Sequence, residues 1–499
     1  MNPATVYMPS PRTRSAPAAG AEPAVSSNAT SLVLAGLSVA LLLLSSVDDG
    51  AFGIVIKLIW VLSVALLTVL DLGLAFGVYI FAVSLYSALF FEGLDFILQR
   101  PDNLALGLIT AACLWRSFPR LGKWKRDAVV WSIMAFLLYA IARCVAGGAS
   151  DYALSIFRRM YLLPFSFFLL MMMAALRTSE LRNFKWMMAA LGSYTGVVCI
   201  AERLDLAHLM LPPWLDLQRL NVSIGTGRSG GILMQPEWTG LSLGMIFALL
   251  IFDFPVKSHA ARLFKRVAVA LCVAGIFVTY TRAAWLAWLL VMGLWFWNIC
   301  KKRQLFRREA LFSRAVAAVV IVAVLLGFAV LPALVNRRIG DPENMYFRLN
   351  LWVAGLHMIA DKPVFGFGVG QYAEQLSEYH EELGSIPFSS IGNEPAPAHN
   401  TLLTVGVELG IVGLLLYLNS VAQILGRAHS VDALLGRSRG SLVTALMMSY
   451  FVNVMFVSAH DLANNMLFYG CLSAIAGNSA VAALPIRRRA VKLVPVAAI

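Results

Sequence analysis

Charged residues are scarce in this chain. Asp, Glu, Lys and Arg make up 13% of its 499 residues, whereas a soluble domain carries about 25%. Hydrophobic residues make up 59%, and the mean hydropathy is +0.75. This composition excludes a soluble enzyme of ordinary build, a disordered protein and a nucleic-acid binder, although the formal net charge is +13 and the pI is about 9.6.

Metal-binding and disulfide patterns are also missing. The six cysteines all lie in or at the ends of apolar runs, and none is spaced as a metal pair. The sequence contains no H-x-x-x-H, D-x-D or C-x-x-C motif. We therefore expect the cysteines to be packing residues, with no disulfide framework, no metal site and no cofactor.

The chain has instead a series of long apolar runs. A membrane-spanning helix needs roughly 20 mostly apolar residues, and these runs predict an all-α polytopic membrane protein with about 12–14 transmembrane helices. The fourteen candidate spans are 31–47, 52–70, 72–91, 103–118, 128–147, 155–176, 186–203, 230–254, 266–281, 283–300, 315–335, 400–425, 441–459 and 463–484.

These runs divide the chain into five parts. Residues 1–30 lack an apolar core and predict a disordered cytoplasmic tail rather than a cleaved signal peptide. A transmembrane bundle over 31–335 is followed by an outer, periplasmic loop over 336–399. C-terminal transmembrane helices over 400–484 and a basic cytoplasmic tail over 485–499 complete the chain.

The outer loop has helical periodicity of its own. An apolar stripe with helical spacing predicts an amphipathic helix that starts near Asp341-Pro342 and ends at Asp361-Lys362-Pro363. A second short helix is predicted over Gln371–Leu383. Between them, the glycine run Gly366–Gly370 predicts a tight turn rather than a phosphate-binding loop, because it lacks the Lys-Ser/Thr ending of such loops.

The placement of the basic residues predicts the topology. Twenty-seven of the 40 Lys and Arg residues fall in alternate loops and in the two terminal tails. Because basic residues near helix ends resist translocation, these segments are expected to be cytoplasmic, with both termini inside.

The basic residues on the outer side carry more information. Arginine left there weakens orientation, and many such residues snorkel to headgroups or pair with acids. Arg228, Arg282 and Arg348 differ because each lies beside glycine or aromatic residues at a helix end, in GTGRSGG, TYTRAAW and MYFRLNLW. Guanidinium groups bind phosphate bidentately, so these three residues predict a pyrophosphate clamp if they converge. The outer set also includes Arg143, Arg158, Arg159, Arg203, Arg219, Arg337, Arg338 and Lys362.

His399 is the candidate general base among the seven histidines. It follows two prolines in EPAPAHN and stands where the chain enters the membrane. Its near-neutral titration suits it to accept a proton from a sugar hydroxyl. Glu408, nine residues on, is expected to make a structural hydrogen bond, and Gly406 and Gly410 form a G-x-x-x-G step that predicts close helix packing.

The order of these motifs resembles the bacterial O-antigen ligase family. The shared features are Arg282 after an apolar helix, R-x-x-x-W at Arg348–Trp352, D-K-P-V-F-G-F-G-V-G, and H-N-T-L-L-x-x-x-x-E-L-G-I-V-G from His399. The resemblance is densest over about 228–425. The family also includes relatives that polymerise O-antigen and exopolysaccharide repeat units.

The resemblance implies a metal-independent, inverting glycosyl transfer on the periplasmic face of the bacterial inner membrane. The donor is a glycan on undecaprenyl pyrophosphate, and the acceptor is lipid A-core or a second lipid-linked glycan. Membrane lipids are the surroundings, and no nucleic acid takes part. Carried over by motif, His399 is the general base, and Arg282 and Arg348 hold the pyrophosphate. The family pattern is looser around Arg228.

Two alternatives stay open at this stage. A polymerase differs from a ligase only in its acceptor, and the sequence favours the ligase only slightly. A transporter or flippase for lipid-linked sugars is a different class, but transporters place ionisable residues near the bilayer midplane and contain repeats. Here the candidate residues gather at the outer edge, which favours the enzyme.

Overall fold

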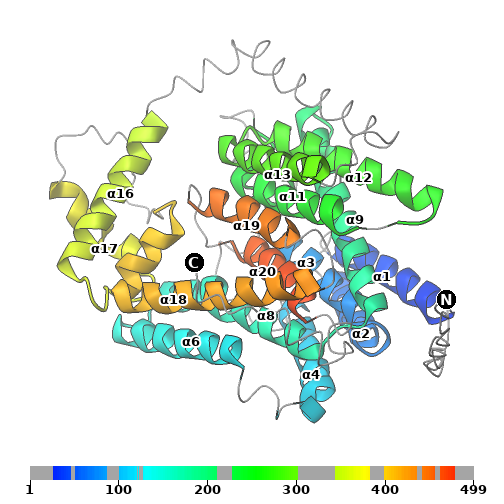
Figure 1. The fold of residues 1–499 in the computed structure, drawn as a ribbon, viewed down its shortest axis with the longest axis horizontal. Coiled ribbons are helices and arrows are strands. Elements are labelled where there is room, and N and C mark those ends of the chain that lie inside the picture. Colours follow the sequence, from blue (N-terminus) through cyan, green and yellow to red (C-terminus); the bar gives the residue numbers. More distant parts are fainter. Residues whose placement is uncertain are drawn as a thin grey trace, which may run out of the picture.

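A computed structural model describes residues 26–45, 51–86, 101–120, 122, 127–210, 228–254, 256–301, 343–382, 398–434, 441–455 and 461–477. The regular structure over these ranges is helical (Figure 1). The helices before residue 210 are α1 (Ser26–Ser45), α2 (Ala51–Leu70), α3 (Leu72–Tyr86), α4 (Pro101–Ser117), α6 (Ala128–Ala146), α7 (Asp151–Ile156), the π-helical turn η3 (Phe157–Leu162), α8 (Leu163–Ala174) and α9 (Thr178–Arg203). The later helices are α11 (Pro236–Phe252), α12 (His259–Val278), α13 (Arg282–Lys301), α16 (Glu343–Asp361), α17 (Gln371–Glu382), α18 (Thr401–Leu434), α19 (Ser441–Val454) and α20 (Leu462–Ala476).

The helices confirm an all-α polytopic membrane protein. In the described ranges, six helices are long and apolar enough to cross a membrane, and five shorter apolar helices accompany them. Helices coincide with thirteen of the fourteen predicted spans, and the remaining span, 315–335, lies outside the described residues. The two predicted loop helices are confirmed as α16 and α17. The start predicted at Asp341-Pro342 lies outside those residues. α1 begins at Ser26, within the segment 1–30 that the sequence predicts as a tail.

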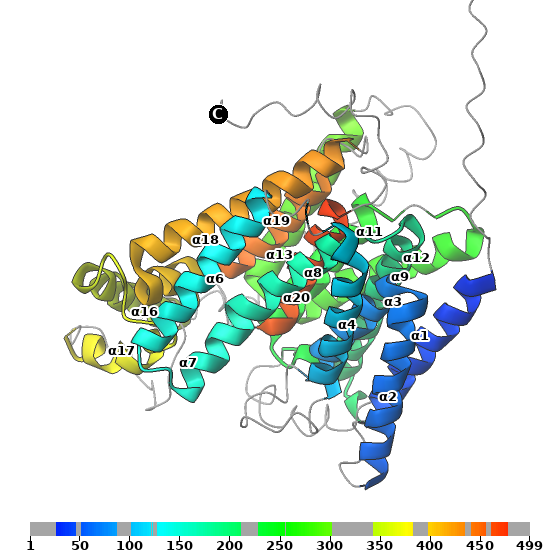
Figure 2. The ribbon, with the colours of Figure 1, turned by 90° about the horizontal axis from the view of Figure 1, so that it is seen from below.

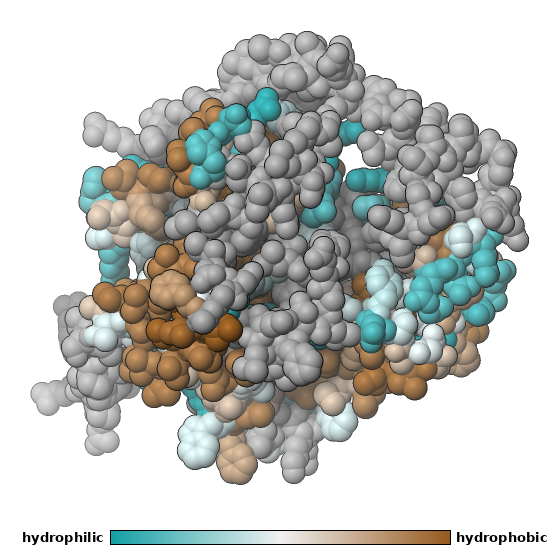
Figure 3. Space-filling model, turned by 180° about the vertical axis from the view of Figure 1, so that it is seen from behind, coloured by the Kyte–Doolittle hydropathy of each residue, from teal (hydrophilic) through white to brown (hydrophobic). Residues whose placement is uncertain are grey.

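The outer surface of the bundle is apolar, as lipid requires. Large hydrophobic side chains are exposed on several helices, for example Val69 on α2 (83%), Leu138 on α6 (62%) and Trp297 on α13 (63%). Seen from behind, much of the described surface is hydrophobic (Figure 3). In lipid such exposure is not a cost, and it agrees with the membrane assignment.

The centre of the bundle consists of helices that are apolar on every side. All residues of α20 are buried, as are those of α3 up to Leu85. α20 packs against α8, α11 and α18 and lies in the middle of both ribbon views (Figure 1 and Figure 2). A helix buried on all faces is expected only in the core of a large bundle.

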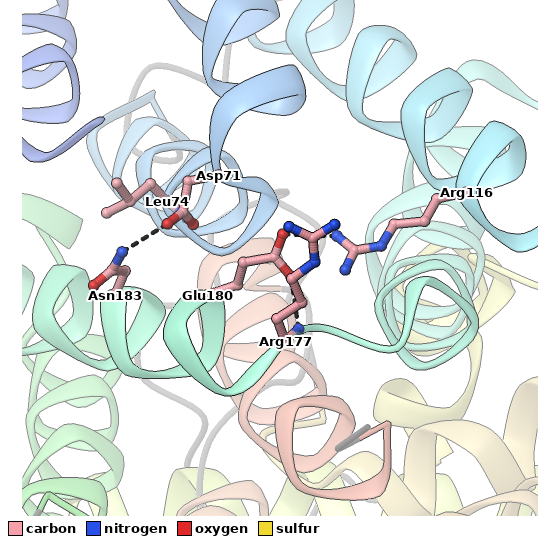
Figure 4. Close-up of polar contacts among 6 residues, drawn as sticks. All are labelled: Asp71, Leu74, Arg116, Arg177, Glu180 and Asn183. Atoms are coloured by element: carbon pink, nitrogen blue, oxygen red, sulfur yellow. Dashed lines mark hydrogen bonds and ion pairs between the residues drawn. The ribbon is translucent and has the colours of Figure 1, made fainter. Parts of the chain in front are cut away.

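A polar cluster closes one end of the bundle (Figure 4). Glu180 pairs with Arg116 of α4 at 2.7 Å and accepts a hydrogen bond from the Arg177 backbone N–H at 2.6 Å. One helical turn along, Asn183 donates to the buried carboxylate of Asp71 at 2.6 Å. The cluster ties the ends of α3, α4 and α9 together.

Two more ion pairs lie at the same end. Lys185 of α9 pairs with Asp253 at 2.6 Å, just beyond α11, and Arg427 of α18 lies 3.9 Å from Asp127 before α6. All of these residues lie at helix ends that the charge pattern predicts to be cytoplasmic. The opposite ends of α9, α11 and α18, together with the start of α13, therefore meet on the other side of the bundle.

α18 is broken in its middle, and the loop between α16 and α17 fills the break. Gly410 has φ 64° and ψ −172°, which is not helical. The loop residues pair with the helix backbone on both sides of it: Phe367 N–H donates to the Val407 carbonyl at 2.9 Å, and Ile411 N–H donates to the Pro363 carbonyl at 2.9 Å. Backbone groups freed within a membrane must find partners in the protein, and here the loop supplies them.

This interlock between the broken helix α18 and the loop 362–370 corrects one expectation from the sequence and supports two others. Gly410 is not half of a helix-packing step, because its backbone leaves the helix and lies against the Val364 carbonyl. Gly366–Gly370 does form a tight turn, with positive φ at residues 366, 368 and 370. Glu408 does make structural hydrogen bonds, which its carboxylate accepts from the backbone N–H groups of Gly370 and Tyr372.

Gly410→Ala should destabilise the protein strongly. The conformation of residue 410 is one that only glycine adopts readily, so the backbone alone costs about 1–3 kcal/mol, and the added Cβ also meets the loop. Thermal unfolding of the purified protein in detergent measures the effect. Gly426→Ala is the matched control in the same helix, since a Cβ there meets nothing within 4 Å. Equal melting temperatures for the two variants would contradict the interlock.

Candidate active site

His399 lies on the short segment that enters α18. Its φ of 48° is in the left-handed region that few non-glycine residues adopt. The next residue, Asn400, caps the helix by accepting a hydrogen bond from the Leu403 N–H at 3.1 Å. The preceding residue, Ala398, is buried, and its carbonyl accepts a hydrogen bond from Trp352 Nε1 at 3.1 Å. His399 is thus held between a helix cap and a tryptophan anchor.

Arg348 stands on the same helix as that anchor. It precedes Trp352 by four residues on α16, so the two side chains share one face of the helix. α16 packs tightly on α18, because a Cβ at Gly355 would meet Leu403 at 2.8 Å. The R-x-x-x-W motif therefore places the Arg348 guanidinium one helical turn from Trp352, whose indole N–H holds Ala398, the residue before His399.

Arg228 and Arg282 are brought together by the turn between α12 and α13. Arg228 donates from Nε to the Thr279 carbonyl at 3.1 Å and from Nη2 to Thr281 Oγ1 at 2.9 Å. Arg282 is the next residue and begins α13. The Ser229 N–H also donates to the Val278 carbonyl at 3.2 Å, which fixes the segment of Arg228 against the end of α12.

Glu237 is the site residue that sequence reasoning missed. It stands in the first turn of α11, and its Oε1 lies 2.7 Å from Arg228 Nη2. An acid directly after Pro236 is typical of a helix N-terminus, so it drew no attention. The available signal was its position: it follows GTGRSGG closely and opens an apolar helix on the side where the outer arginines are expected.

Electrostatic coupling links the four predicted residues and Glu237 to one another through Arg348. Burial lowers the pKa of Arg348; the Glu237 carboxylate opposes this shift, and the charges of Arg228 and Arg282 add to it. The pKa of His399 is lowered to about 4, chiefly by burial and then by the charge of Arg348, while Glu237 opposes both effects. The site thus combines three guanidinium groups, one carboxylate and one imidazole that is neutral at physiological pH.

The other outer basic residues are placed differently. Arg203 lies over the Tyr280 ring at 5.5 Å, and Lys362 lies over the Phe367 ring at 4.1 Å. These are cation–π contacts of a structural kind. Arg219, Arg337 and Arg338 lie outside the described residues.

A metal site is not formed by the residues that the structure describes. Among them there is no group of three or more His, Cys, Asp or Glu side chains that could hold a metal ion. The side chains of the site can themselves bind an anion through the guanidinium groups and transfer a proton through the imidazole.

Comparison with known proteins gives one family. Residues 267–418, a little under a third of the chain, match the family described as O-antigen ligase. A search of curated proteins gave no match. The matched segment contains Arg282, Arg348 and His399, whereas Arg228 and Glu237 lie before it. The resemblance found in the motifs is thereby confirmed, and residues 267–418 form a domain of the O-antigen ligase family.

Proposed function

We propose that the protein is a membrane glycosyltransferase of the O-antigen ligase type, which moves a glycan from undecaprenyl pyrophosphate to an acceptor sugar hydroxyl. One observation supports the proposal: three arginines, a carboxylate and a neutral histidine from separate segments of the chain lie close enough for their charges to act on Arg348 or on one another. The family match over residues 267–418 supports the same reaction class.

The charges of the site suit the donor. Arg228, Arg282 and Arg348 carry three positive charges, and Glu237 offsets one of them, so two remain. A pyrophosphate esterified to a lipid and to a sugar carries two negative charges. Guanidinium groups bind such oxygens bidentately, and fixed cations stabilise the additional charge that develops as pyrophosphate leaves.

His399 would serve as the general base. The acceptor hydroxyl oxygen attacks the anomeric carbon from the face opposite the pyrophosphate, which inverts the configuration. The carbon–oxygen bond to pyrophosphate breaks, and its electron pair leaves with undecaprenyl pyrophosphate. The hydroxyl proton passes to the imidazole. His399 is neutral above pH of about 4, so it is ready to accept that proton, and Glu237 stabilises the imidazolium that forms.

The site would face the periplasm. His399, Arg348, Arg282 and Arg228 lie at helix ends opposite the polar cluster of Glu180 and its partners, on the side that the charge pattern assigns to the outside. In this proposal both termini lie in the cytoplasm and the protein lies in the inner membrane. The lipid-linked donor is available in the outer leaflet of that membrane, beside the site.

The acceptor is lipid A-core in the ligase proposal, and a second lipid-linked repeat unit would make the protein a polymerase. Surface glycan of a deletion strain distinguishes the two. Intact polymer that stays on the carrier lipid indicates a ligase. Single repeat units attached to the core, without long chains, indicate a polymerase. A normal surface glycan would contradict both.

His399→Ala should lower transfer by about 10²–10⁴-fold, the usual contribution of a general base. Purified protein with donor and acceptor in detergent provides the assay. His357→Ala is the control, because that histidine is exposed on α16 and no contact ties it to the site. Transfer that persists in His399→Ala at the level of His357→Ala would remove the base assignment.

Replacing Arg282 or Arg348 with Gln should lower kcat/KM for the donor by about 10–150-fold, since a hydrogen bond to a charged group contributes about 1.5–3 kcal/mol. Lys at either position should restore only part of the loss, because a point charge replaces a planar fork. Arg262→Gln, exposed on α12, tests for a general effect of lost charge. An equal loss in Arg262→Gln would argue against a specific clamp.

The pH profile of kcat/KM should have its acid limb near pH 4, because this parameter reports groups of the free enzyme and the pKa of His399 is lowered to about 4. Below this pH the imidazole is protonated and cannot accept a proton. Arg348→Gln removes a charge that lowers this pKa, so its acid limb should move to higher pH. A wild-type limb near 6.5, the ordinary histidine value, would contradict the buried neutral imidazole.

A further inference from the structure

A second group of arginines lies in the hairpin formed by α6 and α7. Arg143 stands near the end of α6, and Arg158 and Arg159 lie in the π-helical turn η3. Arg143 lies seven residues before Ser150, the N-cap of α7, and Arg158 and Arg159 lie eight and nine residues after it. α6 packs against η3. In an antiparallel hairpin, positions equidistant from the turn lie at the same height, so the three arginines form one level.

Two of these side chains are more buried at Nε than is usual for arginines that extend to the lipid headgroups. The Nε atoms of Arg143 and Arg158 are buried and lack a hydrogen-bond partner in the described part of the chain. Neither residue takes part in an ion pair there. Arg143 donates from Nη2 to the Gly366 carbonyl at 2.9 Å, which leaves Arg158 as the less engaged of the two. A π-turn within an α-helix often marks a functional site.

The carboxylates around this group are mostly occupied by neutral donors. Glu408 accepts hydrogen bonds from the backbone N–H groups of Gly370 and Tyr372, while its Oε2 is buried and has no hydrogen-bond partner among the described residues. Glu374 accepts from Ser150 Oγ at 3.1 Å and from Gln371 Nε2 at 2.5 Å. Asp461 is the acid whose pKa responds to Arg159, but its carboxylate also caps α20 by accepting from the Ala463 N–H at 3.0 Å. Arg158 therefore has positive charge available for a further anion.

The first turn of α20 joins this level to the candidate active site. Asp461, at its start, interacts with Arg159. Asn464, three residues on, donates to the Trp238 carbonyl at 2.9 Å. Trp238 follows Glu237, the carboxylate that pairs with Arg228 at 2.7 Å. The two arginine groups are thus both linked to the start of α20, one through the charge of Asp461 and the other through the Trp238 carbonyl.

From this arrangement we propose that Arg158 and Arg159, supported by Arg143, form a second anion site, which binds a phosphate group of the acceptor lipid. The inference rests on the proposed function. Both substrates of such a transfer are lipids with phosphates at the bilayer surface, so each needs a cationic contact at that level. One site holds the donor pyrophosphate beside His399, and the other holds the acceptor with its sugar hydroxyl directed toward the same imidazole.

The test is acceptor binding to the full-length protein in phosphatidylcholine nanodiscs without donor, so that no turnover occurs. The probes are lipid A-core with its phosphates, the same molecule after phosphatase treatment, and undecaprenyl pyrophosphate as the phosphorylated lipid of a polymerase acceptor. The double variant Arg158→Gln, Arg159→Gln should bind phosphorylated lipid A-core at least about tenfold more weakly than the wild-type protein does. If the acceptor is that of a polymerase, the same loss should appear for undecaprenyl pyrophosphate at the proposed acceptor site. Its affinity for the phosphatase-treated lipid should not change.

Two control variants keep the result specific. Arg158→Lys, Arg159→Lys preserves the charge and should retain most of the affinity, which excludes a folding defect. Arg282→Gln, Arg348→Gln should keep lipid A-core binding within twofold. The inference would be overturned if the double Gln variant bound every phosphorylated probe with wild-type affinity. It would also be overturned if phosphatidylglycerol displaced phosphorylated lipid A-core as effectively as unlabelled lipid A-core does, because that result indicates a general headgroup site. Retained transfer in His399→Ala would instead contradict the proposed function and leave this result unaffected.

Discussion

The ion pair between Arg228 and Glu237, 2.7 Å apart, is the interaction on which the rest of the site depends. It joins the segment before α11 to α11 itself, and the other bonds of Arg228 join both to the turn that carries Arg282. A partly buried pair of this kind is costly unless further hydrogen bonds satisfy its groups, and the threonines of the turn supply them to Arg228. Because the candidate site has three guanidinium groups and one carboxylate, it keeps a positive surplus that an anionic donor can neutralise. The same surplus, together with burial, keeps His399 neutral.

The second half of the site depends on a broken helix. α16 carries Arg348 and Trp352, α18 carries His399 at its start, and the loop after α16 fills the break of α18 at Gly410. Discontinuous helices are also a feature of transporters, where the freed backbone groups coordinate the cargo. In this protein the loop after α16 forms hydrogen bonds with those backbone groups, so the break connects α16 to α18. The arginines and the histidine stand at the helix ends instead, which is the arrangement that a surface reaction on lipid-linked substrates requires.

The sequence predicted the helices well and the contacts between distant segments poorly. Apolar runs such as 128–147 and 186–203 are long enough to specify helices by themselves, and the periodicity around Trp352 located α16. Arg282, Arg348 and His399 were conspicuous because charge at an outer helix end is rare. Glu237 was missed because an acidic residue after proline in the first turn of a helix is explained by its favourable interaction with the helix N-terminus. Gly410 was misinterpreted because four-residue glycine spacing usually indicates helix packing. Its actual partner, Val364, is 46 residues away, and local pattern contains no information about that pairing.

The central claim is that Arg228, Arg282, Arg348 and His399 form one site for a lipid-linked pyrophosphate. A cryo-EM structure of the full-length protein with the undecaprenyl-pyrophosphate-linked donor in nanodiscs tests it most directly. The account predicts pyrophosphate oxygens within about 3 Å of at least two of the three guanidinium groups, the usual length of a charge-assisted hydrogen bond, with the anomeric carbon on the side of His399. Donor pyrophosphate bound elsewhere, with these arginines still directed at Glu237 and the backbone, would contradict it.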